Sequence, residues 1–362
     1  MSGGHDELAD LRQRIDAIDE QVLELVSERA RLAEAVARTK AQRGEGLQVY
    51  RPEREAEVLR RLTARNPGPL TREQVTVLFR EVMSACRALQ QPLTVAFLGP
   101  RGTFTEEAVS KHFGHDAGTA PQATIGAVFR EVESGAAHYG VVPVENSSEG
   151  VVSHTLDRFL DSELAIVGEV ELRIHHALAA HAEALGAVAR VYSHQQGLSQ
   201  CRAWLETHLP HAERQPVSST AEAARLAALE PDAAAIASES AAERYGVPLL
   251  QEQIEDYHGN TTRFLVLGHR SPAPSGHDKT SLVVSSANRT GLLYQLLEPL
   301  SRNGIDMTRI ESRPARQQGV WEYVFFIDIL GHAEDPAVRG ALAEMHERAS
   351  LFRILGAYPR AI

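Results

Sequence analysis

Three side chains with complementary chemistry lie close together in residues 259–264. Asn260 offers an amide, Thr262 a hydroxyl and Arg263 a guanidinium. The apolar run that follows, residues 265–267, predicts a strand directly after them. A guanidinium can bind a carboxylate, and a well-placed hydroxyl can pass a proton to a leaving group. The segment therefore indicates a site that binds a small carboxylate and assists the departure of a leaving group.

Four more polar turns follow predicted strands, at residues 99–105, 144–150, 192–200 and 218–220. We expect the first two and the last to lead from a strand into a helix, with Thr105 as one N-cap. Free N–H groups and the positive end of a helix dipole attract carboxylates at such turns. A single turn of this kind is ordinarily only a helix cap. Four at strand ends favour a shared ligand-binding cleft.

Two cations interrupt the apolar face of the first predicted helix. Arg29 and Lys40 are eleven residues apart, so they return to within ~20° of one face and lie ~16 Å apart along the axis. They could converge on one anionic ligand, because burying unpaired cations is costly. Arg12 lies about 100° around from Arg29 and could reach the site of a second chain. The alternative is that these side chains only extend along a solvated edge.

Helices account for the N-terminal part of the chain. A three-four spacing of apolar residues without Pro or Gly predicts one long helix over residues 8–40. A second helix is expected over 52–65. A third runs to about Gln90, with Thr71 as N-cap and Gln74 completing a capping-box pattern. Helices this elongated bury little against one another, so we expect a partner chain in a homodimer or a higher oligomer.

Strands and helices alternate from Thr94 to about Gly268. The expected strands are residues 94–98, 139–144, 164–170, 190–193, 234–237 and 264–267. This alternation predicts parallel sheets with helices on their faces, arranged as two small lobes that face each other across a cleft.

The C-terminal part follows a linker of Ser, Pro, Ala and Gly at residues 271–276. The expected elements after it are strand 280–285, helix 291–302, strands 306–311 and 321–329, helix 336–347 and strand 352–357. This β-α-β-β-α-β order is ferredoxin-like, an α+β fold.

The composition limits the classes of function. A chain of 362 residues is expected to form two or three domains. Its net charge of −11 argues against nucleic acid or an anionic membrane as a partner. Cys86 and Cys201 fit no metal-ligand spacing, so no metal is expected, and scarce cysteine is typical of a reducing compartment. With no signal-peptide pattern and no apolar run of ~20 residues, we expect a cytoplasmic location.

Residues 8–90 resemble the all-helical chorismate mutase domain that begins many bifunctional prephenate dehydratases. The matching pattern is Arg12, Glu28-Arg29, Lys40, Arg54-Glu55 and Gln90. The resemblance implies rearrangement of chorismate to prephenate without a covalent intermediate.

The same resemblance implies roles for the residues of this pattern. Arg29, and Arg12 from a second chain, would bind the two carboxylates of chorismate. Lys40 and Gln90 would stabilise negative charge on the breaking ether oxygen. Glu55, beside Arg54, would bind the ring hydroxyl. Positioning and fixed charges are sufficient for this chemistry.

Residues 94–267 are similar to prephenate dehydratases. The shared motifs are Leu-Gly-Pro-x-Gly-Thr-Phe at 98–104, Glu-Asn-Ser at 145–147, Tyr-Ser-His at 192–194 with Gln200, and Asn-x-Thr-Arg-Phe at 260–264. The resemblance implies a two-lobed α/β domain of the periplasmic-binding-protein type. It also implies conversion of prephenate to phenylpyruvate, by loss of the ring hydroxyl with decarboxylation.

In this resemblance Thr262 would donate the proton to the departing hydroxyl, and Arg263 would bind a substrate carboxylate or orient the site. His194 could be an acid, although a structural hydrogen bond fits its turn as well. The residues that would hold the carboxylates and the hydroxyl are Asn146, Ser193, Gln200, Ser219 and Thr220.

Residues 279–357 resemble an ACT domain, a module that binds amino acids. The match is the Glu-Ser-Arg-Pro stretch of Glu311, Ser312 and Arg313, whereas the companion Gly-Ala-Leu pattern is Gly291-Leu292-Leu293 here. The segment from Asn288 to Gly291 would receive the carboxylate of an effector, expected to be phenylalanine. The alternative is a purely structural dimerisation domain.

The sequence therefore predicts a helical mutase domain at 1–92, a dehydratase domain at 93–270 and a regulatory domain at 278–362, acting on chorismate and prephenate without a cofactor. One alternative is a dehydratase that prefers arogenate. Another is a non-catalytic protein that senses amino acids. A sensor, however, has no need for charged residues on a buried helical face.

Overall fold

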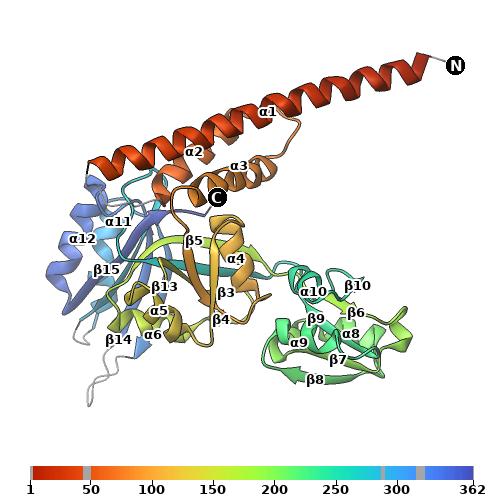
Figure 1. The fold of residues 1–362 in the computed structure, drawn as a ribbon. Coiled ribbons are helices and arrows are strands. Elements are labelled where there is room, and N and C mark those ends of the chain that lie inside the picture. Colours follow the sequence, from red (N-terminus) through yellow and green to blue (C-terminus); the bar gives the residue numbers. More distant parts are fainter. Residues whose placement is uncertain (1–2, 44–49, 287–289, 315–322, 362) are drawn as a thin grey trace.

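The computed structural model describes residues 3–43, 50–286, 290–314 and 323–361. Its N-terminal part consists of the three expected helices, α1 Gly3–Gln42, α2 Pro52–Ala64 and α3 Arg72–Ala88. Helix α1 extends far beyond the rest of the chain, and α3 packs against both α1 and α2 (Figure 1). The predicted capping box is present: Thr71 Oγ1 accepts from the Gln74 N–H at 3.2 Å, and Gln74 Oε1 accepts from the Thr71 N–H at 2.9 Å.

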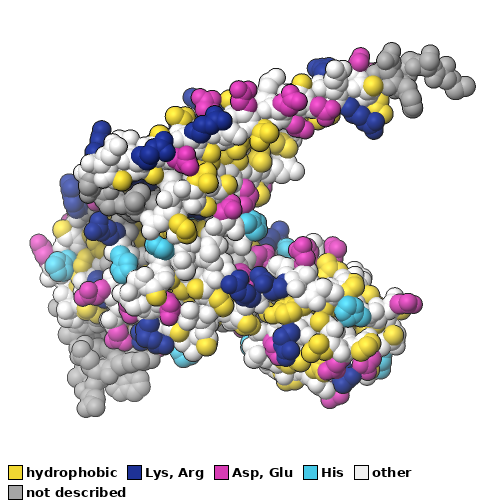
Figure 2. Space-filling view, viewed as in Figure 1, with side chains coloured by type: hydrophobic (Ala, Val, Ile, Leu, Met, Phe, Trp, Pro, Cys, Tyr) yellow, Lys and Arg dark blue, Asp and Glu magenta, His cyan; other side chains and the backbone are white. Residues whose placement is uncertain are grey.

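The apolar stripe of α1 is largely uncovered in the single chain. Ile15 and Ile18 are each 56% exposed, and Leu25 is 65% exposed. Figure 2 shows apolar side chains along the length of this helix. Exposure on this scale is what the sequence indicates for a helix that packs against a partner chain. The homodimer itself stays a prediction.

The first lobe of the middle part is a six-stranded sheet, with the order β2-β1-β3-β11-β5 and β4 on β3. Its strands are β1 Thr94–Leu98, β2 Gly118–Gln122, β3 Tyr139–Asn146, β4 Gly150–Val151, β5 Ala165–Arg173 and β11 Thr261–Gly268. Helices α4 Phe104–Phe113, α5 Ile125–Glu133 and α6 Ser153–Asp161 cover it. Strands β1, β2 and β3 are parallel, but β11 is antiparallel to β3 and β5.

The expectation of parallel sheets is therefore wrong for this lobe, and it is wrong for the second lobe as well, whose sheet also contains antiparallel pairs. The chain leaves along β5, builds the second lobe and returns along β11, so the returning strand runs in the opposite direction. The sheet is mixed for that reason.

The second lobe has a five-stranded sheet with the order β10-β6-β9-β7-β8. Its strands are β6 Ala177–Ala180, β7 Arg190–His194, β8 Glu213–Val217, β9 Ala233–Ala237 and β10 Leu249–Gln251. Its helices are the short 3-10 turn η1 Leu185–Ala187 with α7 Gln195–Gln200, α8 Arg202–His208, α9 Thr220–Ala227 and α10 Glu239–Tyr245. The sequence does not predict β2 or β8, because each is a half-exposed edge strand interrupted by a proline.

The C-terminal part has the expected β-α-β-β-α-β order. Its elements are β12 Asp278–Ser285, α11 Leu292–Arg302, β13 Met307–Pro314, β14 Tyr323–Leu330, α12 Pro336–Arg348 and β15 Leu351–Pro359. The strands form an antiparallel sheet with the order β13-β14-β12-β15. The fold class predicted for each of the three parts is confirmed.

The central strands β12 and β14 of the C-terminal sheet are buried on both faces, whereas the edge strand β13 is half-exposed. Residues such as Leu282, Phe325 and Ile327 pack under α11 and α12 on one face. Phe326 and Tyr358 on the other face join the core of lobe 1. Strand β15 approaches β5 so closely that a Cβ on Gly356 would lie 2.1 Å from the Ile166 carbonyl oxygen. The C-terminal domain and lobe 1 therefore form one continuous core.

Candidate active sites

A pocket of about 280 Å³ lies between the two lobes. Its polar lining includes Asn146, Asn260 and Thr262 from lobe 1 and His176, Gln200, Ser219 and Thr220 from lobe 2. The structure thus brings together five of the residues that the sequence predicts for the dehydratase site, which are Asn146, Gln200, Ser219, Thr220 and Thr262. We call this cavity the interlobe pocket.

Asn146 fixes the orientation of the Thr262 hydroxyl. Its Oδ1 accepts the backbone N–H groups of Ser148 at 2.9 Å and Glu149 at 3.1 Å, so its amide nitrogen must face the other way. That nitrogen donates to Thr262 Oγ1 and to Asn260 Oδ1, each at 2.8 Å. Because Thr262 accepts this bond, its own hydroxyl hydrogen is left to donate to a ligand.

His176 is a pocket residue that sequence reasoning misses. Its Nε2 lies 2.7 Å from Gln200 Oε1, so Nε2 carries the proton. Burial lowers the pKa of this imidazole, which keeps the ring neutral. Among the described residues, neither His176 Nδ1 nor Gln200 Nε2 has a hydrogen-bond partner. In the sequence, the feature that could have pointed to His176 is the adjacent pair His175-His176, located where the chain crosses from lobe 1 to lobe 2.

Two helix N-termini of lobe 2 border the pocket. Ser219 caps α9 by accepting the Glu222 N–H at 3.0 Å, which confirms the expected helix start. His194 caps α7 by accepting the Gln196 N–H at 3.3 Å. This is the structural hydrogen bond that was one of the two interpretations of His194.

Ser193 and Arg263 lie outside the lining of the interlobe pocket. Ser193 is completely buried, and its hydroxyl donates to the Ile236 carbonyl at 2.8 Å, so it joins β7 to β9. Arg263 follows Thr262 in β11, and successive side chains of a strand point to opposite faces. Its guanidinium therefore points toward the C-terminal domain. For Ser193 the structure corrects the predicted contact with substrate. For Arg263 it argues against binding of a substrate carboxylate, whereas the other interpretation, that Arg263 orients the site, stays a prediction.

Two of the predicted helix-capping turns also differ in the structure. Helix α4 begins at Phe104 with Thr103 in the N-cap position, so Thr105 lies inside the helix. Residues 144–150 form the turn of a β3–β4 hairpin and do not lead directly into a helix. Asn146 makes the turn by bonding to its own backbone, which is the alternative use of an Asn side chain.

A second pocket, of about 490 Å³, lies within the three N-terminal helices. We call it the helical pocket. Cations dominate its polar lining, and the predicted residues that line it are Arg29, Lys40, Arg54, Glu55 and Gln90. Arg29 donates only a long hydrogen bond of 3.4 Å, to the Val82 carbonyl. Within the described part of the chain, neither Arg29 nor Lys40 has an ion-pair partner.

Arg87 is a lining residue of the helical pocket that the sequence analysis misses. It is 4% exposed and bridges the Glu55 carboxylate and the Phe113 carbonyl. Burial raises the pKa of Glu55 even though Arg87 acts in the opposite direction. Arg87 lies in the last turn of α3, three residues before Gln90, which follows the end of the helix; this spacing could have indicated that the two residues lie close together. Arg54 pairs with Glu57 at 2.5 Å.

Arg12 does not reach the helical pocket of its own chain. It is exposed on the extended part of α1, seventeen residues before Arg29, which is ~26 Å along the helix axis. This distance agrees with the prediction that Arg12 serves a second chain.

The predicted effector residues are divided between two faces of the C-terminal sheet. Arg313 pairs with Asp157 of α6 at 3.2 Å, so it faces lobe 1, and Glu311 lies on the same side by strand alternation. Ser312 faces the helices instead. Gly291 has a φ of 78° and immediately precedes α11, where Leu292 is buried. Asn288 lies outside the described residues.

Neither a membrane span nor a metal cluster is found in the described ranges. No helix there is long and apolar enough to cross a bilayer. No group of three or more His, Cys, Asp or Glu side chains there is arranged to hold a metal ion.

Three family patterns match successive parts of the chain. Chorismate mutase type II matches residues 11–91, prephenate dehydratase residues 95–272 and the ACT domain residues 280–347. The bifunctional chorismate mutase/prephenate dehydratase of Pseudomonas aeruginosa is 52% identical over 361 residues, covering 99% of both chains.

Solved structures match the dehydratase and C-terminal parts. A prephenate dehydratase from Arthrobacter aurescens, in complex with L-Phe, is 38% identical with a TM-score of 0.69, covering 74% of this chain and 90% of its own. GqqA, described as a quorum quenching acylase, is 29% identical with a TM-score of 0.69, covering 74% of this chain and 98% of its own.

Proposed function

The chain belongs to the bifunctional chorismate mutase/prephenate dehydratase family, and on that premise we propose that its helical and interlobe pockets are the two active sites. The observation that carries the proposal is that predicted residues of each reaction, scattered along the sequence, line one pocket apiece. Phenylalanine biosynthesis is the pathway that these activities serve.

In the interlobe pocket the reaction is loss of water and carbon dioxide from prephenate. The Thr262 hydroxyl donates a proton to the ring hydroxyl, and the C–O bond breaks to release water. A solvent water then returns a proton to Thr262 and leaves hydroxide, so the net products are phenylpyruvate, CO₂ and hydroxide. The bond between the ring and its carboxylate breaks to release CO₂, and its electron pair completes the aromatic ring of phenylpyruvate. A neutral threonine is a weak acid, so its contribution rests on the fixed hydrogen bond from Asn146.

The second lobe supplies the groups that hold prephenate in place. The N-terminus of α9, beginning at Ser219 and Thr220, offers N–H groups to a carboxylate. His176, at the crossing between the lobes, and Gln200 of lobe 2 add further polar atoms to the lining of the pocket. Both substrate ends are thereby fixed without a metal or a cofactor.

In the helical pocket the reaction is the rearrangement of chorismate. Arg29 binds one carboxylate, and Lys40 with Gln90 stabilises the negative charge that develops on the ether oxygen as the C–O bond breaks. Glu55, whose carboxylate is held by Arg87, accepts a hydrogen bond from the ring hydroxyl of the substrate. The site is completed by Arg12 of a second chain in a cytoplasmic homodimer.

We further propose that the ACT domain binds phenylalanine and inhibits the dehydratase. The bound L-Phe of the Arthrobacter aurescens structure and the ACT match at residues 280–347 support this effector. An arogenate-preferring dehydratase stays the enzyme alternative, and the fused mutase domain favours prephenate. A non-catalytic sensor does not explain two pockets with these side chains.

The test is to supply chorismate, and in a separate assay prephenate, to the purified protein in the presence of a chelator. Chorismate, prephenate and phenylpyruvate are followed with and without phenylalanine. We expect prephenate and then phenylpyruvate to appear, with the second step suppressed by phenylalanine. Turnover of prephenate but not of chorismate would mean that the helical domain serves only in dimerisation. Turnover of neither substrate would contradict the proposal.

A further inference from the structure

The two strands that carry Asn146 and Thr262 present a second matched pair on their opposite face. Thr262 of β11 is the register partner of Asn146 of β3, and both line the interlobe pocket. The preceding residue of β3 is Glu145 and the following residue of β11 is Arg263, which are also register partners. Because side chains alternate along a strand, this second pair lies behind the first.

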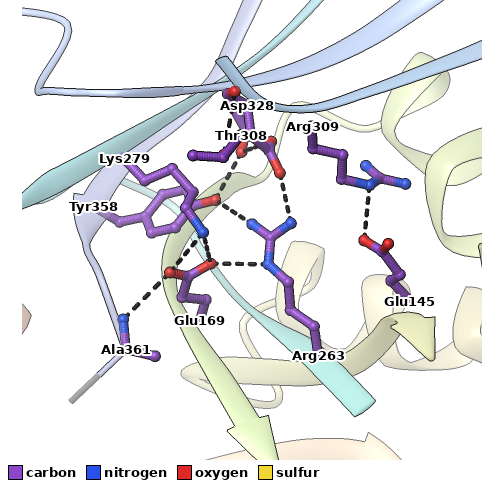
Figure 3. A network of polar contacts seen from close by, with 10 residues as sticks. Glu145, Glu169, Arg263, Lys279, Thr308, Arg309, Asp328, Tyr358 and Ala361 are labelled. Atoms are coloured by element: carbon purple, nitrogen blue, oxygen red, sulfur yellow. Dashed lines mark hydrogen bonds and ion pairs between the residues drawn. The ribbon is translucent and has the colours of Figure 1, made fainter. Parts of the chain in front are cut away.

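Arg263 is held by a buried charge cluster shared with the ACT domain (Figure 3). Its guanidinium donates to Glu169 of β5 at 2.8 Å and to Asp328 of β14 at 2.5 Å. Lys279 of β12 pairs with Glu169 at 2.7 Å. Tyr358 of β15 accepts from Arg263 at 3.0 Å. The two cations and two carboxylates balance, so the cluster fixes Arg263 against three strands of the ACT sheet.

Glu145 is held from the same side. Arg309 of β13 pairs with it at 3.0 Å (Figure 3). The side chain of Arg309 is 10% exposed, whereas that of Glu145 is 40% exposed. Both residues of the rear pair thus meet an ACT side chain of opposite charge, one from β13 and one from β14.

We propose that Arg263 and Glu145 are positioning residues, through which the ACT sheet holds Thr262 and Asn146 in register for the dehydratase reaction. Neither of the two reaches the substrate. Each is the chain neighbour of a pocket residue, and each lies on a strand whose opposite face forms ion pairs with the ACT domain. The inference rests on the proposed function of the interlobe pocket.

The geometry makes the reaction sensitive to the ion pairs that Arg263 and Glu145 form with the ACT domain. The 2.8 Å bond from Asn146 to Thr262 spans β3 and β11. A shift of one strand relative to the other would misdirect the Thr262 hydroxyl. A displacement of about 1 Å can cost ~10²-fold in rate, so release of either ion pair should lower the dehydratase kcat.

These ion pairs also connect the strand predicted to bind the effector to the interlobe pocket. Arg309 lies on the same strand and the same face as Glu311 and Arg313, which the sequence predicts to bind the effector. A ligand that moves β13 would change the Arg309–Glu145 contact directly. In this scheme bound phenylalanine changes the Arg309–Glu145 contact and thereby the register of Asn146 and Thr262. The states with and without phenylalanine then differ in a defined contact, which a shift between two states requires.

The test exchanges the charges of the Glu145–Arg309 pair. Glu145→Arg and Arg309→Glu should each lower the prephenate kcat about tenfold or more, with KM changed less than threefold, since like charges then face each other. The double variant should recover at least half of the wild-type kcat. In each single variant phenylalanine should still bind by calorimetry but inhibit less. Asp328→Asn should lower kcat in the same way through Arg263.

Arg353→Met is the matched control, because it removes another contact between the two domains, to the Ser162 carbonyl, that is not beside a pocket residue. Its kcat should stay within twofold of wild type, and mutase activity should be unchanged in every variant. Folded single variants with wild-type kcat, or a double variant that recovers nothing, would overturn the proposal. Failure of the wild-type protein to use prephenate would instead reject the proposed function.

Discussion

The Thr262 hydroxyl, which we propose as the proton donor, lies in a pocket that contains no strong acid among its described residues. Its hydrogen is free because Asn146 is locked with the amide nitrogen toward it. His176 is neutral, since burial lowers the pKa of its ring. We therefore expect catalysis at this site to depend on the direction of one hydroxyl rather than on a shifted pKa.

Replacement of Thr262 by Val tests this role. Valine keeps the shape of the side chain and removes the hydroxyl, so the dehydratase kcat should fall by about 10²–10⁴-fold, the usual range for loss of an acid–base group. Thr262→Ser restores the hydroxyl and should keep kcat within about tenfold of wild type. The assay follows phenylpyruvate, with mutase activity as the check on folding. A valine variant that keeps more than a tenth of the rate would exclude Thr262 as the donor.

The predicted site residues fall into two groups, those that reach the interlobe pocket and those that point away from it. Asn146, Gln200, Ser219, Thr220 and Thr262 all reach the pocket, because a motif places them at an edge where strands end. Ser193 and Arg263 are in the same motifs but point away. Residue type alone cannot decide this, since Thr262 and Arg263 are neighbours on one strand. The start of β11 at Thr261, rather than at Phe264, decides which of the two faces the cleft.

At the scale of the elements, Tyr50 joins the helical domain to lobe 1. Its hydroxyl lies 2.5 Å from Nε2 of His112 on α4, and its ring contacts Phe113 and Tyr139. Burial lowers the pKa of His112 to about 3, so the ring is neutral and accepts from Tyr50. Burial also raises the pKa of Tyr50 well above its ordinary value, which keeps the phenol protonated as the donor.

This contact predicts a loss of stability in acid. An unfolded histidine binds a proton below pH ~6.5, whereas folded His112 resists protonation until pH about 3. Across that window the unfolded state holds the extra proton, so stability falls as the pH falls. The cost is at most about 1.4 kcal/mol per pH unit, and less here because the ring is partly exposed.

The measurement compares urea unfolding of wild type and His112→Gln at pH 7 and pH 5. Glutamine can still accept from Tyr50 but does not titrate, so the variant should lose less stability between the two values. Other acid-sensitive groups are common to both proteins and cancel in the comparison. Equal losses in the two proteins would show that His112 does not control this transition.

Element order is well predicted where periodicity is strong and poorly predicted where it is interrupted. The helices of the N-terminal domain and the β-α-β-β-α-β order of the ACT domain follow from regular apolar spacing. Edge strands β2 and β8 do not, because each contains a proline and has little buried surface. The antiparallel direction of β11 is likewise invisible in the sequence, since it depends on the second lobe being inserted between β5 and β11.

At the scale of the whole molecule, the ACT sheet contacts both the helical domain and lobe 1. One face packs under its own helices and the other joins the core of lobe 1, while α2 contacts β15. The ACT sheet therefore touches both catalytic parts directly. The sequence distinguishes the three domains by the spacing of their apolar residues. It contains no signal for this shared core, because the core arises from contacts between residues far apart in the chain.

The exposed stripe of α1 and the distance of Arg12 from its own pocket lead to a prediction for the assembly. In a homodimer with shared mutase sites, Arg12→Ala and Lys40→Ala should each abolish nearly all mutase activity, because every site lacks one cation. A heterodimer of the two variants contains one site with both residues intact and one site with neither. After random exchange half of the dimers are of this kind, so mixing should restore about a quarter of the wild-type mutase activity. If Arg12 acted within its own chain, both sites of the heterodimer would stay defective and mixing would restore nothing.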